Sequence, residues 1–130
     1  MPKPLVLIVE DEGLIALHLT DLLTEAGYPI AGIFPSGEEA LERFGTLPYP
    51  GVVLMDISLG GNLDGIETAR RMRLKREVPI IFITAHAKDA VGSRIRKNQQ
   101  TDFLIKPTLD NQILVTIEKV TDSFPASPPP

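Results

Sequence analysis

Four groups of residues with reactive or charged side chains stand at the ends of short apolar runs. They are the acidic run Glu10-Asp11-Glu12, the single residues Asp56 and Thr84, and Lys106. Crowded carboxylates repel one another, and a divalent cation such as Mg²⁺ or Mn²⁺, which accepts oxygen ligands, relieves that repulsion. A carboxylate nucleophile beside such a cation and a lysine is suited to phosphoryl transfer, with an aspartyl phosphate as the product.

The apolar runs alternate with segments of helical periodicity, a pattern typical of parallel α/β proteins. In the segment 13–27, apolar residues at helical spacing predict one buried stripe, formed by Ile15, Leu19, Leu22, Leu23 and Ala26. Ser36 and Glu39 form a capping box, which predicts that a second helix begins there. We therefore expect strands at 5–9, 29–34, 52–55, 79–84 and 102–106, and helices at 13–27, 36–47, 65–75, 88–98 and after Asp110 as N-cap.

Five strand–helix units with right-handed crossovers predict a doubly wound parallel sheet with helices on both faces. Ligands of such sheets bind beyond the carboxyl ends of the strands, where all four groups would stand. Each group alone has an ordinary explanation: Asp56 as a turn residue, the acidic run as the first turn of a helix, and Lys106 as a surface lysine. Their coincidence at four strand ends favours one common site.

Four motifs in this chain resemble those of response regulator receiver domains of two-component signal transduction. They are the string LVLIVEDE at 5–12, Met55-Asp56-Ile57 with Asp64-Gly65 downstream, Ile83-Thr84-Ala85, and FLIKP at 103–107. The resemblance extends to about Ser123 and implies a flavodoxin-like (βα)5 fold with strand order 2-1-3-4-5. It also implies a phosphorylation-dependent signalling switch, which dephosphorylates itself slowly and is not a turnover enzyme.

The resemblance assigns a role to each charged residue of the predicted site. Asp56 matches the phosphoacceptor, and Lys106 matches the lysine that pairs with the phosphoryl oxygens. Glu10 and Asp11 match the acidic pair that binds Mg²⁺ or Mn²⁺ together with Asp56. The backbone carbonyl of Ser58 is expected to complete the ligands that the protein supplies.

The resemblance also implies how the switch works. Thr84 and Phe103 match the two switch residues, whose hydroxyl engages the phosphoryl group while the aromatic ring moves inward. The small Ala85 leaves access to the acceptor, and His86 and Ser58 are hypothetical modulators of the lifetime of the phosphoryl group.

The partners implied are of two kinds. The expected phosphodonor is the phosphohistidine of a histidine kinase or of a histidine phosphotransfer protein. The expected output is altered binding of a downstream protein or an attached output domain through the face of helix four, strand five and helix five, where a homodimer is also conceivable for this family.

Some positions depart from the family pattern. Ten residues run from Asp56 to Gly65, both included, where many relatives have nine. Gly60-Gly61-Asn62 replaces the usual proline-containing turn. Phe103 cannot donate the hydrogen bond of a tyrosine, and Thr108 stands where phenylalanine is common. These departures concern the acceptor loop and the switch.

Three further expectations concern the surroundings of the site. Leu14 lies near the polar stripe of the first helix, close to the active edge of the sheet, and is a hypothetical docking contact for the phosphodonor. His18 lies on the polar face of the same helix and has no predicted role. The Lys106–Pro107 peptide is cis in many relatives.

The composition argues against binding to nucleic acids or membranes. The 130 residues include 13 basic and 17 acidic side chains, for a net charge of −4, whereas nucleic-acid-binding domains carry a basic excess. The basic cluster at 70–76 is interpreted as a solvated helix end. No apolar run spans a bilayer, and the lack of cysteine fits a cytoplasmic location. We expect one receiver domain over 1–123 and a proline-rich tail or linker over 124–130.

Three other function classes fit the sequence less well. A haloacid-dehalogenase-like phosphatase needs a second acid two residues after the nucleophile, where this chain has Ser58. A pseudo-receiver, which binds partners without phosphorylation, does not explain the intact acceptor, acidic pair, threonine and lysine. A flavin-binding flavodoxin needs a Ser/Thr/Gly-rich phosphate loop after the first strand, where this chain has Glu10-Asp11-Glu12.

Overall fold

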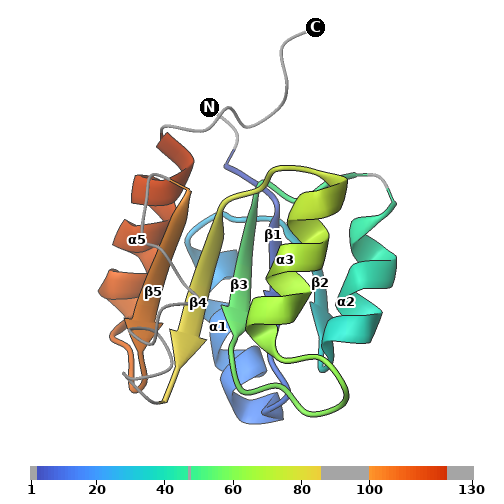
Figure 1. Cartoon of the computed structure of the whole chain (residues 1–130). Coiled ribbons are helices and arrows are strands. Elements are labelled where there is room, and N and C mark those ends of the chain that lie inside the picture. Colours follow the sequence, from blue (N-terminus) through green and yellow to red (C-terminus); the bar gives the residue numbers. More distant parts are fainter. Residues whose placement is uncertain (1–2, 47, 86–99, 123–130) are drawn as a thin grey trace, which may run out of the picture.

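Five parallel strands form one sheet in the order β2-β1-β3-β4-β5 (Figure 1). The structure is a computed structural model and describes residues 3–46, 48–85 and 100–122. The strands are β1 (Val6–Val9), β2 (Ile30–Phe34), β3 (Val52–Asp56), β4 (Ile80–Thr84) and β5 (Thr101–Ile105). This order confirms the flavodoxin-like topology that the resemblance implied.

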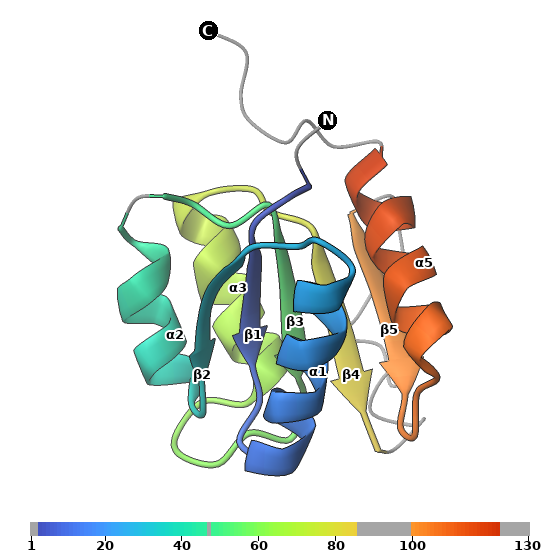
Figure 2. The same cartoon turned by 180° about the vertical axis from the view of Figure 1, so that it is seen from behind.

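Helices cover both faces of the sheet. The described helices are α1 (Gly13–Glu25), α2 (Gly37–Phe44), α3 (Gly65–Lys75) and α5 (Asp110–Asp122). Figures 1 and 2 show α2 and α3 on one face, and α1 and α5 on the other. The helix predicted at 88–98 and the tail from residue 123 lie outside the described residues, so that helix and the domain boundary stay predictions.

The core consists of two apolar layers, one on each side of the sheet. Along β1, Val6 and Ile8 belong to the layer beneath α1 and α5, whereas Leu7 and Val9 belong to the layer beneath α2 and α3. Because helices cover both faces, alternating residues are all buried, and the strand is apolar throughout. The predicted stripe of α1 faces the first layer: Leu19 and Leu23 are buried, and its other members pack against that layer.

Several predicted element boundaries were wrong by one to three residues. The predicted stop of α1 at Gly27 is confirmed, since Glu25 is the last helical residue and Gly27 leaves the helix with a φ of 91°. Helix α2 begins after the Ser36 cap as predicted, but ends at Phe44 before Gly45. Asp110 is the first residue of α5 and not a cap that precedes it. Strand β3 includes Asp56 as its last residue. The carboxyl ends of the five strands nevertheless lie within one residue of their predicted positions.

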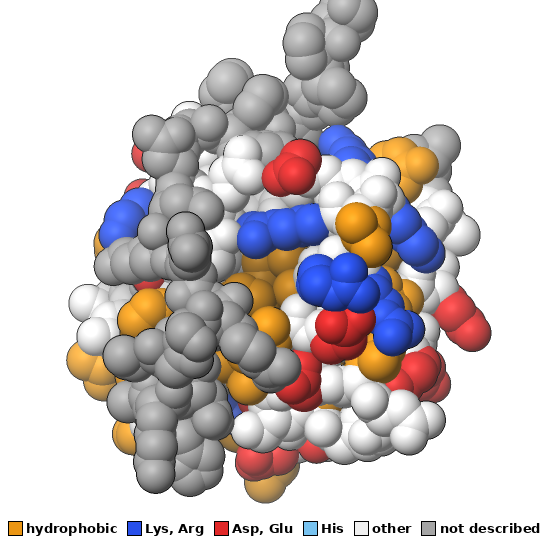
Figure 3. Space-filling model, in the orientation of Figure 1, with side chains coloured by type: hydrophobic (Ala, Val, Ile, Leu, Met, Phe, Trp, Pro, Cys, Tyr) orange, Lys and Arg blue, Asp and Glu red, His pale blue; other side chains and the backbone are white. Residues whose placement is uncertain are grey.

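The basic cluster at 70–76 is only partly a solvated surface. The side chains of Arg70 and Arg71 are exposed on α3, and Figure 3 shows basic and acidic side chains together on this face. Arg73 instead turns inward and donates to the backbone carbonyls of Val78, at 3.1 and 3.2 Å, and Gln100, at 3.0 Å. This arginine therefore joins the end of α3 to the beginnings of β4 and β5.

The junction between β3 and α3 leaves no room for a side chain at Gly65. Its N–H donates to the Ile57 carbonyl at 2.9 Å. A Cβ atom there would lie 2.1 Å from the carbonyl oxygen of Asp56 and 2.8 Å from the Cα of Ile57. Because these are backbone atoms of the site's own strand end, they cannot move aside without displacing Asp56.

We predict that Gly65→Ala lowers the free energy of unfolding by about 2–3 kcal/mol, through overpacking against this backbone. Gly13→Ala is the matched control, since a Cβ atom added there would meet no non-neighbouring atom of the described residues within 4 Å; its stability should be unchanged or up to about 1 kcal/mol higher. Urea denaturation of both variants measures the difference. Equal stability of the two variants would show that the β3–α3 junction tolerates a side chain.

Candidate functional site

Three carboxylates converge at the carboxyl edge of the sheet. Asp56 ends β3 and Glu10 directly follows β1, and each is only 3% exposed. Asp11 is exposed beside them. One carboxylate oxygen from each of the three lies within 4.8 Å of the others. The parallel register of β1 and β3, which aligns Val9 with Met55, brings these residues to one level.

Lys106 is the cation of this cluster. It follows β5, and its Nζ lies 3.3 Å from Glu10 Oε1, 3.5 Å from Asp56 Oδ2 and 3.9 Å from Glu12 Oε1. Its backbone N–H donates to the carbonyl of Thr84 at 2.7 Å, which fixes the lysine beside the end of β4. The peptide that joins it to Pro107 is cis, as the resemblance implied.

The pKa values of Glu10 and Lys106 are shifted by burial and by the neighbouring charges. Burial, followed by the hydrogen bond and the negative charge of Asp56, raises the pKa of Glu10 to about 7. Burial alone would lower the pKa of Lys106, but the carboxylates of Asp56, Glu10 and Glu12 outweigh it and raise that pKa overall. The lysine thus stays charged, yet one ammonium does not balance the acidic cluster. Oxygen ligands with excess negative charge fit a hard divalent cation such as Mg²⁺.

The other predicted site residues lie around this cluster. Thr84 is buried at the end of β4, and Ala85 follows it at the surface. Phe103 is half-buried in β5 and packs against the apolar layer beneath α2 and α3. The backbone N–H of Ser58 donates to Asp56 Oδ1 at 3.1 Å. His86 lies outside the described residues, and the roles assigned to these residues stay predictions.

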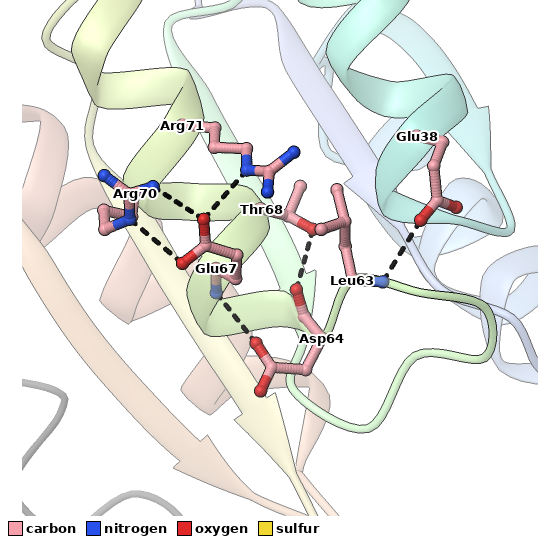
Figure 4. Close-up of polar contacts among 7 residues, drawn as sticks. All are labelled: Glu38, Leu63, Asp64, Glu67, Thr68, Arg70 and Arg71. Atoms are coloured by element: carbon pink, nitrogen blue, oxygen red, sulfur yellow. Dashed lines mark hydrogen bonds and ion pairs between the residues drawn. The ribbon is translucent and has the colours of Figure 1, made fainter.

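The loop between β3 and α3 is held by two acidic side chains. The N–H of Gly60 donates to Asp11 Oδ2 at 3.3 Å, and the N–H of Leu63 donates to Glu38 Oε1 at 3.1 Å (Figure 4). Gly61 adopts a φ of 89°, which favours glycine. The loop ends at Asp64, which caps α3 by accepting from the N–H of Glu67 at 2.8 Å. Sequence reasoning missed Glu38, because no local pattern connects an exposed acid of α2 with a loop 25 residues away.

An apolar groove of about 520 Å³ opens beside Lys106 between α1 and the β5–α5 connection. Its lining residues are Leu14, Ile15, His18, Leu19, Ile83, Lys106, Pro107, Thr108 and Ile113. Leu14 is 85% exposed at its edge. His18 Nε2 lies 2.7 Å from Asp110 Oδ1, which joins α1 to the start of α5. This pair spans 92 residues of sequence and could not be predicted from the position of His18 on a polar face.

The sequence profile of the response regulator receiver domain matches residues 6–118. The chain belongs to this family. Receiver domains act as phosphorylation-dependent signalling modules of two-component systems, not as classical turnover enzymes, and generally bind Mg²⁺ at an acidic pocket. They interact with kinases or phosphotransfer proteins and with output domains. None of the described helices has the length and apolar character needed to cross a membrane.

Individual relatives agree with this assignment. The transcriptional regulatory protein PdtaR of Mycobacterium tuberculosis is 35% identical over 92% of this chain, which spans 57% of the length of PdtaR. The chemotaxis protein CheY of Thermotoga maritima is 32% identical over 89% of this chain and 96% of its own length. The signal receiver domain of a modulated diguanylate cyclase from Desulfovibrio desulfuricans has a TM-score of 0.82 at 38% identity, covering 92% of this chain and 94% of that domain.

The raised pKa of Glu10 predicts how the metal-free receiver responds to pH. Between about pH 4.5 and 7 the folded state holds more protons than the unfolded state, so stability falls as the pH rises through this window. In EDTA at pH 8, Glu10→Gln should therefore be more stable than the wild type by roughly 1–3 kcal/mol. This advantage should shrink towards zero near pH 4.5.

Urea denaturation in EDTA across this pH range measures the effect, and Glu25→Gln, an exposed residue of α1, is the control. Mg²⁺ should stabilise the wild type more than Glu10→Gln, because the variant lacks one of the clustered negative charges. Equal stability of the wild type and Glu10→Gln at pH 8 would show that the negative charge of Glu10 is not destabilising in this buried acidic cluster.

Proposed function

We propose that the receiver is a switch in which Asp56 accepts a phosphoryl group from the phosphohistidine of a histidine kinase or a histidine phosphotransfer protein. The observation that carries this proposal is the position of Asp56. Its buried carboxylate lies 3.5 Å from the Lys106 ammonium and beside the oxygens of Glu10 and Asp11. The proposed nucleophile, its counter-charge and the proposed ligands of the cation thus lie in one cluster.

The transfer replaces one bond to phosphorus with another. A carboxylate oxygen of Asp56 attacks the phosphorus, the P–N bond of the phosphohistidine breaks, and its electron pair stays on the departing imidazole. Lys106 pairs with the phosphoryl oxygens as they enter the pocket. Glu10, Asp11, Asp56 and the Ser58 carbonyl would hold Mg²⁺, which when bound would neutralise charge on the phosphoryl oxygens. Attack of water on the acyl phosphate later regenerates Asp56 and releases inorganic phosphate.

The switch then acts through Thr84 and Phe103. The Thr84 hydroxyl engages the phosphoryl group, and the half-buried ring of Phe103 moves inward, which shifts a pre-existing equilibrium. The backbone bond from Lys106 to Thr84 supports this route, because it joins β4 to the end of β5. The surface that responds is formed by helix four, β5 and α5, of which helix four lies outside the described residues. A homodimer through this surface stays a prediction.

The output is the binding of another protein or of an attached domain in the cytoplasm. The net charge of −4 supports a protein target over DNA. PhyR from Bartonella quintana, whose solved structure is 26% identical to this chain and is matched over 49% of its own length, is an anti-anti-sigma factor. Binding to a regulator of transcription is therefore a candidate output for this receiver.

The phosphodonor docks in the apolar groove between α1 and the β5–α5 connection. The groove adjoins Lys106, so a helix seated there would bring its histidine towards Asp56. Leu14, which is exposed at the edge of the groove, would be covered by that helix. Burial of this leucine contributes binding energy only in the complex with the phosphodonor.

Intact mass after incubation with acetyl phosphate and Mg²⁺ tests the acceptor. We expect the wild type to gain one phosphoryl group, whereas Asp56→Asn gains none and EDTA prevents the gain. Lys106→Ala should slow the gain at least about tenfold, because the phosphoryl oxygens lose their positive partner. A phosphoryl group on Asp56→Asn would assign the acceptor to another residue. No gain in any protein, and no binding of beryllofluoride, would indicate a pseudo-receiver.

Leu14→Glu tests the docking groove. Phosphoryl transfer from a purified histidine kinase that phosphorylates the wild type should slow at least about tenfold, since a charge replaces the buried contact. Phosphorylation by acetyl phosphate, which needs no docking, should be unchanged. Leu17→Glu is the matched control, because Leu17 is exposed on the same helix but does not line the groove. Equal transfer to both variants would exclude Leu14 from the interface.

A further inference from the structure

Helices α2 and α3 place opposite charges side by side on one exposed face of the receiver. Glu38, Glu39 and Glu42 lie on the exposed side of α2. Arg70 and Arg71 lie on the exposed side of α3, with Lys75 one turn further on. This α2–α3 face is distinct from the phosphodonor groove and from the β5–α5 surface, because α1 and α5 cover the opposite side of the sheet (Figures 1 and 2).

We propose that two copies of the receiver associate through the α2–α3 face, with the arginines of α3 in each copy contacting the glutamates of α2 in the other. The proposal goes beyond phosphorylation and does not depend on it. A two-fold axis that lies in the interface and runs parallel to both helices places α2 of each copy over α3 of the other. The same contact then forms twice, as closed symmetry requires.

The relative height of the two helices supports this pairing. A Cβ at Gly37, the first residue of α2, would lie 2.1 Å from Thr68 Oγ1, so the start of α2 is level with the first turn of α3. At the other end, the Lys75 ammonium lies 3.7 Å from the Cβ position of Gly45. Glu39 and Glu42 therefore stand at the height of Arg70 and Arg71. Rotation about a two-fold axis parallel to the helices does not change the position of a residue along that axis. The glutamates of α2 in one copy are therefore level with the arginines of α3 in the other copy, so opposite charges meet.

Glu67 holds the two arginines in a defined arrangement. Its carboxylate accepts from Arg70 Nε at 2.9 Å and Nη2 at 2.7 Å, and from Arg71 Nε at 2.8 Å (Figure 4). Nη1 of Arg70 and both terminal nitrogens of Arg71 have no partner among the described residues, and they can bind carboxylates of another molecule. Because the guanidinium groups are already oriented, less conformational entropy is lost on association.

The acidic side of the face has a shape that can receive an arginine. A hollow of about 370 Å³ is lined by Phe34, Glu39, Glu42, Arg43 and Thr46. Its two carboxylates and its aromatic ring suit a guanidinium group on an aliphatic stem. The guanidinium of Arg43, which also borders the hollow, donates to Thr46 and to the carbonyl of Pro48 and forms no ion pair with Glu39 or Glu42 among the described residues. Leu74, which is 73% exposed on α3, adds apolar contact area.

The geometry also sets the strength of the association. Helix α3 has 11 residues and is therefore about 16 Å long, so the face is smaller than the roughly 800 Å² per partner of a stable complex. Most of its contacts are between exposed charges, which salt screens. We expect a weak dimer, with a dissociation constant of roughly 0.1–1 mM, that weakens at least about threefold between 20 and 300 mM NaCl.

Charge reversal and its restoration test the proposal in the full chain. Sedimentation equilibrium of the wild type should show a monomer–dimer equilibrium. Arg70→Glu/Arg71→Glu and Glu39→Arg/Glu42→Arg should each weaken self-association at least about tenfold, since like charges then face each other. An equimolar mixture of these two variants should associate again, because every contact regains opposite charges. Asp21→Arg/Glu25→Arg on α1 is the matched control and should behave like the wild type.

Circular dichroism of each variant confirms that it is folded before sedimentation. A wild type that stays monomeric at the highest concentration would overturn the proposal. So would a dimer that survives both reversals, which would place the interface on another face, or a mixture that fails to associate although each variant is folded. Phosphorylation of the same samples by acetyl phosphate is a separate readout, so failure here leaves the function of Asp56 untouched.

Discussion

The repulsion among buried carboxylates at the carboxyl edge of the sheet is the constraint on which the rest of the site depends. Glu10 and Asp56 are almost fully buried, and Asp11 lies beside them. Burial first, and then the hydrogen bond and the negative charge of Asp56, raise the pKa of Glu10, and the nearby ammonium of Lys106 does not offset them. The sheet must supply enough stability to hold this cluster together. It does so through strands that are apolar on both faces and covered by helices.

The same repulsion explains why the surrounding loops are fixed by specific hydrogen bonds. Asp56 accepts from the N–H of Ser58, and Asp11 accepts from the N–H of Gly60. Each bond places a backbone N–H of the loop that follows β3 against a carboxylate oxygen and so stabilises its negative charge. Entry of a cation or a phosphoryl group changes the charge that these oxygens carry. The loop is therefore placed to respond to occupancy of the site, even though its glycines depart from the family pattern.

The sequence sufficed for the fold and for the residues at the strand ends, but not for contacts between distant elements. Continuous apolar strands and helical stripes are local patterns, so the α/β class and the approximate element positions could be predicted from them, whereas the strand order followed from the resemblance to receiver domains. The end of α1 at Gly27 could be predicted, because glycine commonly terminates a helix, whereas the end of α2 was placed about three residues too late. The bond of Glu38 to the β3–α3 loop joins elements with no shared pattern and emerges only from packing.

The two helix-covered sides of the sheet differ in the side chains that they expose. On the α1 side, apolar side chains surround the groove beside Lys106, which suits a partner that must exclude water from the acceptor. On the α2–α3 side, paired acids and arginines leave the surface charged and hydrated. The two sides of one sheet thus differ, with an apolar groove beside Lys106 on one side and exposed charged side chains on the other. The helices that form both surfaces pack against the same five-stranded sheet, so neither surface requires a change at the buried carboxylates of the sheet edge.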